Sequence, residues 1–383
     1  MQDVSGWKLR LDAETIAAYT SSGQWTNTTV WQAAERYARQ SADRVVLVEG
    51  AVQMTVRQVV DAARQLAAGL HAIGLRAGDV ISYQLPNWWE TVVINLAACA
   101  SGLIVNPIVP IYRDGEVRHV LRDARTRAFF VPESFRGFDH LGMATRLRAE
   151  LPDLSHVVVV RGSAPRTSAN TSFDAILAAG RSDDRPMRIP DPNAVKLVLY
   201  TSGTTGRPKG VLHTHNTLMS EINAVIDYWR VGEDDVVIMP SPVTHVTGYL
   251  YALELPFVAR ASTVLMERWD AGLAAALIHR HRATLTVGAT PFLAELAQQA
   301  GPWEGLPSLR VFASGGAPVP PEIVSRARRA LVNCAVFRVY GSSEAPTVSL
   351  GIAAGDDPEL GATTDGRIVN NQVRICDPAT GAH

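Results

Sequence analysis

Residues 200–211 bring glycines, hydroxyl side chains and one lysine together in the stretch YTSGTTGRPKGV. Glycines let several backbone N–H groups converge on an anion, hydroxyls add hydrogen-bond donors, and Lys209 adds a compact positive charge. The stretch follows an apolar run over residues 194–199, which predicts a buried strand. It precedes residues 214–229, whose apolar positions recur at helical spacing. A strand, a flexible turn and a helix in this order predict a phosphate-binding loop.

Three other interpretations of this stretch are possible: a Walker A loop, a glycine-rich surface turn and a flexible linker. A Walker A loop, GxxxxGK[ST], does not fit, because Lys209 follows Pro208 and precedes Gly210. A glycine-rich surface turn or a flexible linker would not ordinarily carry a lysine, a proline and a strand beside it. Phosphate binding is therefore the favoured interpretation.

A second candidate group, Tyr340 to Glu344, follows the strand expected over residues 336–339. A turn after a parallel strand lies at the strand's carboxyl end, where α/β proteins bind ligands. A nucleoside triphosphate requires Mg²⁺, which prefers hard oxygen ligands from few protein groups. Glu344 is therefore a candidate metal ligand. Alone, the segment would more commonly be an ordinary turn; beside a phosphate loop, the functional interpretation is favoured.

Two more turns contain residues that could contact a ligand. Gly315 and Gly316 end another expected strand, and paired glycines allow a ligand to approach the backbone closely. The same residues also suit a tight strand-to-helix turn. His245 lies before an apolar helix, where a lone histidine is most often structural. His213 and His215 lack an HExxH pattern and a cysteine partner, so we expect structural roles for them.

Taken together, these motifs resemble the adenylate-forming superfamily of acyl-CoA synthetases, luciferases and the adenylation domains of peptide synthetases. The stretch YTSGTTGRPKGV resembles the family's phosphate loop, and YGSSE at 340–344 resembles its nucleotide motif. The similarity continues through residues 85–90 and 106–116, to which we assign no catalytic role, and through residues 364–367, where we expect Asp365 to be a plain turn residue.

The resemblance implies roles for individual residues. It implies that Tyr340 packs on adenine, that Glu344 and Thr201 bind Mg²⁺, and that His245 lies beside the substrate carboxylate. Lys209, His245 and Thr201 would then be catalytic. The implied nucleotide contacts are Thr201, Ser202, Gly203, Thr204, Thr205, Gly206, Lys209, Gly315, Gly316, Ala317, Pro318, Tyr340, Gly341, Ser342, Ser343 and Glu344. The implied substrate contacts are His245, Val246, Gly248, Gly315 and Gly341.

Composition limits the class of protein. The chain has 383 residues, 47% of them apolar and 19% charged, with a net charge of −1. This length predicts a large core in two or three units, and the balanced charge argues against nucleic-acid binding. Cys99, Cys334 and Cys376 are far apart and odd in number, which suggests a reducing compartment. We find no signal peptide, and the most apolar segment, residues 92–109, is too interrupted to cross a membrane. We therefore expect a soluble, cytoplasmic protein.

The pattern of elements predicts an α/β fold of layered, mostly parallel sheets flanked by helices. Helices are expected at 28–40 with Asn27 as cap, 55–71 with Thr55 as cap, 88–100, 113–123, 141–150, 214–229, 271–282 and 291–300. Strands are expected at 80–85, 103–105, 128–131, 157–160, 194–199, 236–239, 262–265, 285–287, 309–313 and 336–339. Beyond residue 340 the helices should stop, and strands at 347–352 and 372–376 should form a small β-rich (distorted barrel) subdomain. The predicted domains are residues 1–190, 191–339 and 340–383.

The resemblance implies the large domain of an acyl-CoA ligase that uses ATP, Mg²⁺ and coenzyme A. It would join a small carboxylic acid to AMP and hold the acyl-adenylate for transfer to coenzyme A. A ligase that performs only the thioester step and a non-catalytic binder remain alternatives; a kinase is disfavoured by the lack of its loops. The implied partners are small molecules, and a homodimer stays open. The family's mobile C-terminal domain is expected to be absent from this sequence, through shortening or natural division.

Overall fold

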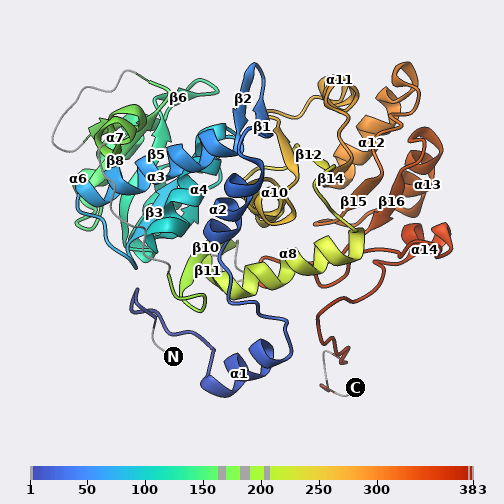
Figure 1. Ribbon diagram of the computed structural model, residues 1–383, viewed down its shortest axis with the longest axis horizontal. Helices are drawn as coiled ribbons and strands as arrows, with labels where there is room; N and C mark the ends of the chain where they lie inside the picture. The colour runs from blue at the N-terminus through green and yellow to red at the C-terminus, as the bar shows by residue number, and fades with distance from the viewer. Residues whose placement is uncertain (1–2, 163–169, 182–189, 202–207, 378–379, 382–383) are drawn as a thin grey trace.

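Two seven-stranded sheets form the framework of the protein (Figure 1). The computed structural model describes residues 3–162, 170–181, 190–201, 208–377 and 380–381. The first sheet has the order β11-β10-β4-β3-β5-β8-β9, and the second has the order β16-β15-β14-β12-β13-β1-β2. All neighbouring pairs are parallel except β10–β11 and β1–β2, which are antiparallel. The predicted α/β class with mostly parallel sheets is confirmed.

The strands of the first sheet are β3 (Val80–Tyr83), β4 (Ile104–Pro107), β5 (Thr126–Pro132), β8 (His156–Val160), β9 (Asn170–Ser172), β10 (Val195–Thr201) and β11 (Lys209–Thr214). Those of the second are β1 (Val45–Glu49), β2 (Val52–Thr55), β12 (Val236–Met239), β13 (Ser262–Leu265), β14 (Leu285–Gly288), β15 (Val311–Ser314) and β16 (Ala335–Arg338). Strands β6 (Ser134–Phe135) and β7 (Phe138–Asp139) form a small hairpin. Each large sheet thus contains strands from both sides of residue 190. The domain boundary expected at that residue stays a prediction.

The helices are α1 (Ala13–Ser21), α2 (Val30–Ser41), α3 (Val56–Ala72), α4 (Trp89–Ser101), α5 (Asp114–Asp123), α6 (His140–Glu150), α7 (Phe173–Gly180), α8 (His215–Trp229), α9 (Val246–Gly248), α10 (Leu255–Ala259), α11 (Ala271–His281), α12 (Thr290–Gln299), α13 (Pro321–Ala330) and α14 (Pro358–Thr363). A π-helix, η1 (Tyr249–Glu254), joins α9 to α10, and a 3₁₀ turn, η2 (Gly301–Trp303), follows α12.

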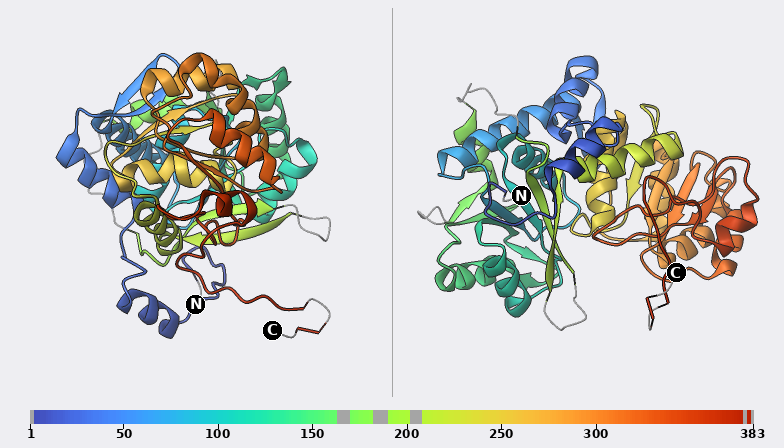
Figure 2. Two further views of the ribbon diagram at one scale, coloured as in Figure 1. Left: turned by 90° about the vertical axis from the view of Figure 1, so that its right-hand side faces the viewer. Right: turned by 90° about the horizontal axis from the view of Figure 1, so that it is seen from below.

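Both faces of each sheet are covered, which gives alternating helical and sheet layers. In β5, Phe130 belongs to the central core, whereas Phe129 packs in the outer cluster with α5 and α6. In β15, Ala313 belongs to the same central core, whereas Phe312 packs outward with α11, α12 and α13. The central core therefore contains strands of both sheets and helices α2, α3, α4, α8 and α10. Figure 2, seen from below, shows α8 reaching between the two sheets. Strands buried on both faces explain the continuous apolar runs in the sequence.

The expected helix boundaries hold to within a few residues, with one cap wrong. Thr29, rather than Asn27, caps α2, because its side chain accepts from the backbone of Gln32 and completes a capping box. Asn27 has a left-handed φ of 54° and lies outside the helix. Thr55 caps α3 as predicted.

Three expectations about local structure are wrong. The glycine-rich stretch is followed by strand β11 before α8 begins, because residues 209–214 pair with β10. The strand expected over residues 347–352 is reduced to two isolated bridges, Ser349 with Ile368 and Gly351 with Gly366, and residues 372–376 form no strand. A further helix, α14, forms beyond residue 340, with Asp357 as its cap and Pro358 in its first turn.

Candidate functional site

Three of the predicted motifs follow parallel strands of the second sheet. The parallel strands β16, β15, β14 and β12 are adjacent, so their carboxyl ends meet at one edge. The His245 segment follows β12, residues 315–318 follow β15, and residues 340–344 follow β16. Backbone hydrogen bonds continue past the strand ends, from Gly315 N to Gly288 O (3.3 Å) and from Val339 N to Ser314 O (2.9 Å). The fold therefore gathers these motifs at the edge where α/β proteins bind ligands.

The turn after β16 is fixed by hydrogen bonds, while its candidate ligand-binding side chains stay accessible. Tyr340 N donates to Ser349 Oγ (2.9 Å), and Ser342 N donates to Ala345 O (2.9 Å). A side chain on Gly341 would overlap the Pro346 carbonyl, so only glycine fits there. Tyr340 is 57% exposed. Glu344 is also exposed, and its carboxylate accepts no hydrogen bond from the described residues.

The turn after β15 presents its backbone. Gly315 packs closely against β16, because an added Cβ would lie 2.6 Å from the Val339 carbonyl oxygen. Gly316 has a φ of 79° and meets no other residue, and Ala317 and Pro318 after it are exposed. An accessible backbone at the carboxyl end of a parallel strand can receive a flat or anionic group.

His245 caps α9 and remains accessible to solvent. Its Nδ1 accepts from Thr247 N (3.3 Å), which leaves Nε2 available to a ligand. Desolvation by the surrounding protein lowers the pKa of His245, so the imidazole is neutral at pH 7. Val246 and Gly248 are buried; Gly248 packs on the Pro242 carbonyl, so its small size serves packing.

Thr201 and Lys209 face each other across the β10–β11 hairpin. Ser202, Gly203, Thr204, Thr205 and Gly206 lie outside the described residues. Helix α5 anchors the loop end of the hairpin, because Tyr200 Oη donates to Asp123 Oδ2 (2.6 Å) and His119 Nε2 donates to Pro208 O (3.2 Å). Lys209 is exposed, so its ammonium can reach a ligand.

Strand β11 and helix α8 hold residues 343–351 along a row of hydrogen bonds. His213 Nε2 donates to Ser343 O (2.7 Å), and Glu221 Oε2 accepts from Thr347 N (3.1 Å). At the end of α8, Tyr228 Oη donates to Gly351 O (3.0 Å) and Trp229 Nε1 donates to Leu350 O (2.9 Å). The β10–β11 hairpin and the turn over residues 340–344 are thereby joined through β11 and α8. His213 is buried and has the structural role expected for it.

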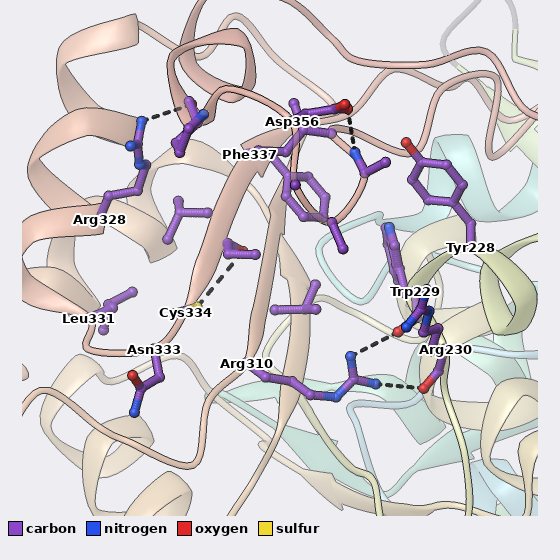
Figure 3. Close-up of a pocket in the computed structure, with 18 of the residues that line it drawn as sticks. Tyr228, Trp229, Arg230, Arg310, Arg328, Leu331, Asn333, Cys334, Phe337 and Asp356 are labelled. Atoms are coloured by element: carbon purple, nitrogen blue, oxygen red, sulfur yellow. Dashed lines mark hydrogen bonds between the residues drawn. The ribbon is translucent and has the colours of Figure 1, made fainter.

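A pocket of about 580 Å³ lies at the opposite, amino-terminal edge of the second sheet (Figure 3). It is lined by Trp229 at the end of α8, by Arg328 of α13 and by the first residues of β15 and β16. Arg310 closes one side, where its Nη1 donates to Trp229 O (2.8 Å) and its Nη2 to Arg230 O (3.2 Å). No residue of the predicted site lines this pocket, so its size alone does not identify the functional site.

A metal site built by the protein alone is absent from the described residues, where no three His, Cys, Asp or Glu side chains gather. Glu344 nevertheless fits Mg²⁺, because a single accessible carboxylate suits an ion whose other ligands are phosphate oxygens and water. The donor set at this edge is therefore compatible with Mg²⁺ brought by a nucleotide.

Two groups of charged residues in the interior were not predicted from the sequence. Lys196 in β10 pairs with Glu254 in η1, and both are almost completely buried. Asn95 Nδ2 also donates to Glu254 Oε1 (3.0 Å), and Tyr249 Oη donates to Asn95 Oδ1 (2.5 Å). The second is Glu221, described above. A lysine within an apolar strand was the one available signal, since such a charge requires a buried partner.

Comparison with known families gives a direct result. A family model described as AMP-binding enzyme matches residues 34–383. The chain belongs to this family. Its membership confirms the resemblance to adenylate-forming enzymes that the motifs indicated.

Individual relatives agree with this assignment. The medium-chain fatty-acid–CoA ligase of Escherichia coli (strain K12) is 31% identical over 88% of this chain and 59% of its own length. The 4-coumarate-CoA ligase 1 of Narcissus pseudonarcissus is 30% identical over 89% of this chain and 62% of its own. The chain thus spans about three fifths of these relatives. The solved structure of the anthranilate CoA ligase AuaEII, in complex with anthranoyl-AMP, has the same fold, with a TM-score of 0.82, 23% identity and coverage of 93% of this chain and 67% of its own.

The helices of the described residues include none that is both long and apolar enough to cross a membrane.

Proposed function

We propose that this chain is the ATP- and acid-binding part of an acyl-CoA ligase. It binds ATP and a small carboxylic acid at the carboxyl edge of the second sheet and holds the acyl-adenylate for transfer to coenzyme A. The observation that carries the proposal is that the His245 segment, the Gly315 turn and the Tyr340–Glu344 turn follow three parallel strands, β12, β15 and β16, whose carboxyl ends lie at one edge of the second sheet. The names of the two CoA-ligase relatives support the thioester step.

The chemistry is a displacement at phosphorus. A carboxylate oxygen of the acid attacks the α-phosphorus of ATP, the bond to the β-phosphate breaks, and pyrophosphate leaves. The thiol of coenzyme A then attacks the acyl carbon, AMP leaves, and the thiol proton is released. No covalent enzyme intermediate is needed, so the protein contributes positioning and charge.

Each site residue has a proposed part in this reaction. His245, neutral and accessible through Nε2, would donate a hydrogen bond to the acid and orient its carboxylate. Lys209 and the donors of residues 201–206 would hold the β- and γ-phosphates. Tyr340 would cover the adenine, and Glu344, with Thr201, would hold Mg²⁺, which supplies charge neutralisation at the phosphates. The three unpaired cysteines support a cytoplasmic location.

Lys209 can be tested without mutation, because the chain contains only three lysines: Lys8, Lys196 and Lys209. Lys8 and Lys209 are exposed, whereas Lys196 is buried. We expect ATP to slow amine acylation at Lys209 but not at Lys8, measured by mass spectrometry of peptides. A non-hydrolysable acyl-adenylate should protect Lys209 less, since it has no β- or γ-phosphate. Equal protection by both ligands, or none by ATP, would exclude Lys209 as a contact to these phosphates.

Two substitutions separate a ligand role of His245 from its capping role. His245→Ala removes both the imidazole and the cap, whereas His245→Asn retains a cap acceptor for Thr247 N. We expect both variants to weaken binding of the acid by about tenfold or more, the loss of one hydrogen bond to a charged group, with ATP affinity unchanged. Calorimetry with acid and with ATP gives the two affinities. Normal acid binding by His245→Asn would assign His245 to capping alone.

A further inference from the structure

The His245 segment, which joins β12 to α9, is held by a side chain that comes from the other sheet. Strand β12 belongs to the second sheet, whereas Asn87 follows β3 of the first sheet (Figure 1). Asn87 Nδ2 donates to Met239 O (3.3 Å) and to Ser241 O (2.9 Å). Its Oδ1 accepts from Val243 N (2.8 Å). One buried amide group thus holds the backbone of this segment at three positions.

The backbone of Val243, two residues before His245, is fixed by side chains at the carboxyl end of β3. Its N–H donates to Asn87, and its carbonyl accepts from Tyr83 Oη (3.1 Å). His245 N then donates to Pro242 O (2.9 Å), which closes the turn into α9. Asn87, Tyr83 and Val243 are each at most 3% exposed, so water has little access to replace these hydrogen bonds. The direction in which the imidazole leaves the segment therefore depends on Asn87 and Tyr83.

The hydrogen bonds at position 87 require an amide. The amide nitrogen faces two carbonyl oxygens and the amide oxygen faces a backbone N–H, so a carboxylate of the same shape would oppose both carbonyls. The segment has fewer contacts of other kinds. Ser241 Oγ donates to Val287 O (3.1 Å), but the enclosed hydroxyl of Thr244, directly before His245, forms no hydrogen bond with the described residues. Loss of the amide would therefore loosen the part of the segment closest to the imidazole.

We propose that Asn87 is a positioning residue for the acid, which fixes the His245 segment so that Nε2 of His245 points to the carboxyl group. The inference rests on the proposed function, in which His245 donates a hydrogen bond to the acid. It adds that the first sheet sets the geometry of acid binding, although His245 itself follows a strand of the second sheet. Because Asn87 acts through His245, its removal should affect acid binding only while the imidazole is present.

The probes are hexanoyl- and benzoyl-sulfamoyl adenosine, non-hydrolysable compounds whose acyl carbonyl stands in for the carboxyl group of the acid. The reference ligand, 5′-O-sulfamoyladenosine, lacks the acyl group. We expect Asn87→Ala to weaken the tighter-binding acyl probe by about three- to tenfold and to leave the affinity of the reference ligand unchanged. Asn87→Asp should weaken the same probe similarly, because a carboxylate keeps the acceptor for Val243 N but loses both donated hydrogen bonds. Calorimetry measures these affinities.

A double variant tests whether Asn87 acts through His245. In the His245→Ala background, Asn87→Ala should cause no further loss of acyl-probe affinity, so the two single losses are not additive. A residue that only stabilises the fold would cost the same affinity with or without the imidazole. If the Asn87 variants do not fold, Tyr83→Phe removes only the hydroxyl that holds Val243 O. Its loss of about twofold or more should likewise disappear in the His245→Ala background.

The matched control is Asn216→Ala, the same change at another buried asparagine. The amide of Asn216 in α8 also forms three hydrogen bonds, with Asn27 and Asn193, and neither partner belongs to the His245 segment. Asn216→Ala should lower the thermal midpoint, as Asn87→Ala does, because both remove partners from buried polar groups. It should leave the affinities of the acyl probes unchanged.

The outcomes separate this inference from the proposed function. The positioning role of Asn87 is wrong if Asn87→Ala leaves acyl-probe affinity unchanged, weakens the reference ligand equally, or gives a loss that adds to that of His245→Ala. Adenylate binding stands in each of these cases. If the unaltered chain binds neither acyl probe, the proposed function itself is contradicted.

Discussion

Replacing Lys196 by methionine should lower the free energy of unfolding by about 3–5 kcal/mol, the usual cost of removing one partner of a buried ion pair. The side chain of Lys196 is 1% exposed, and that of Glu254 is fully enclosed. Burial by itself disfavours the ammonium form, but the neighbouring Cys99 and Glu254 raise the pKa of Lys196, so the side chain stays charged. Without it, the one hydrogen bond that the Glu254 carboxylate keeps from the described residues is that of Asn95 Nδ2.

A double variant provides the control for this prediction. In Lys196→Met with Glu254→Gln, the buried charge is gone and the amide oxygen can still accept from Asn95, so most of the lost stability should return. Urea and thermal unfolding of the unaltered chain, both single variants and the double variant give the coupling between the two residues. A loss below about 1 kcal/mol for Lys196→Met would mean that the pair does not stabilise the junction of β10 and η1.

Glu344→Gln should weaken binding of MgATP by about 100-fold, which corresponds to about 2.7 kcal/mol, while the fold is retained. The carboxylate is exposed at the carboxyl edge of the second sheet, and its removal takes away a negative ligand without disturbing a described hydrogen bond. Two ligand states should be insensitive to the substitution: ATP measured in EDTA, and a metal-free acyl-adenylate analogue. Calorimetry with and without Mg²⁺ measures all of these affinities.

The matched control is Glu322→Gln, the same change at an exposed position in the first turn of α13. This variant should bind MgATP as the unaltered chain does. Normal MgATP binding by Glu344→Gln, or an equal loss in EDTA, would show that Glu344 is not a metal ligand.

The fold class could be predicted because its signals are local. Short apolar runs alternating with amphipathic helices require parallel strands joined by crossover helices. Strand β11 was missed because its formation depends on pairing with β10 across the glycine-rich stretch, not on the pattern of residues 209–214 alone. The bridge of Ser349 with Ile368 similarly joins segments too distant for a local pattern to show.

The placement of the candidate site could be predicted for those residues that directly follow a strand. Once strands were expected before Gly315 and Tyr340, parallel order alone placed the two turns at one edge. Glu221 and Glu254 could not be found in this way. The partner of Glu221 is 126 residues away in Thr347, and that of Glu254 is 58 residues away in Lys196. The local sequence around each glutamate does not distinguish it from an ordinary exposed residue of a helix. The packed structure is needed to show that both face the protein interior.

The most direct test of the account is a calorimetric competition between ATP and an acyl-sulfamoyl adenosine on the unaltered chain. Both ligands would use the turn at Tyr340 and the backbone at Gly315, so we expect one site per chain and full exclusion of Mg²⁺-ATP by the adenylate analogue. Tyr340→Ala should weaken both ligands together, because both would stack adenine on this exposed ring. Simultaneous binding of the two ligands, or the absence of binding by either, would contradict an adenylate site at the carboxyl edge of the second sheet.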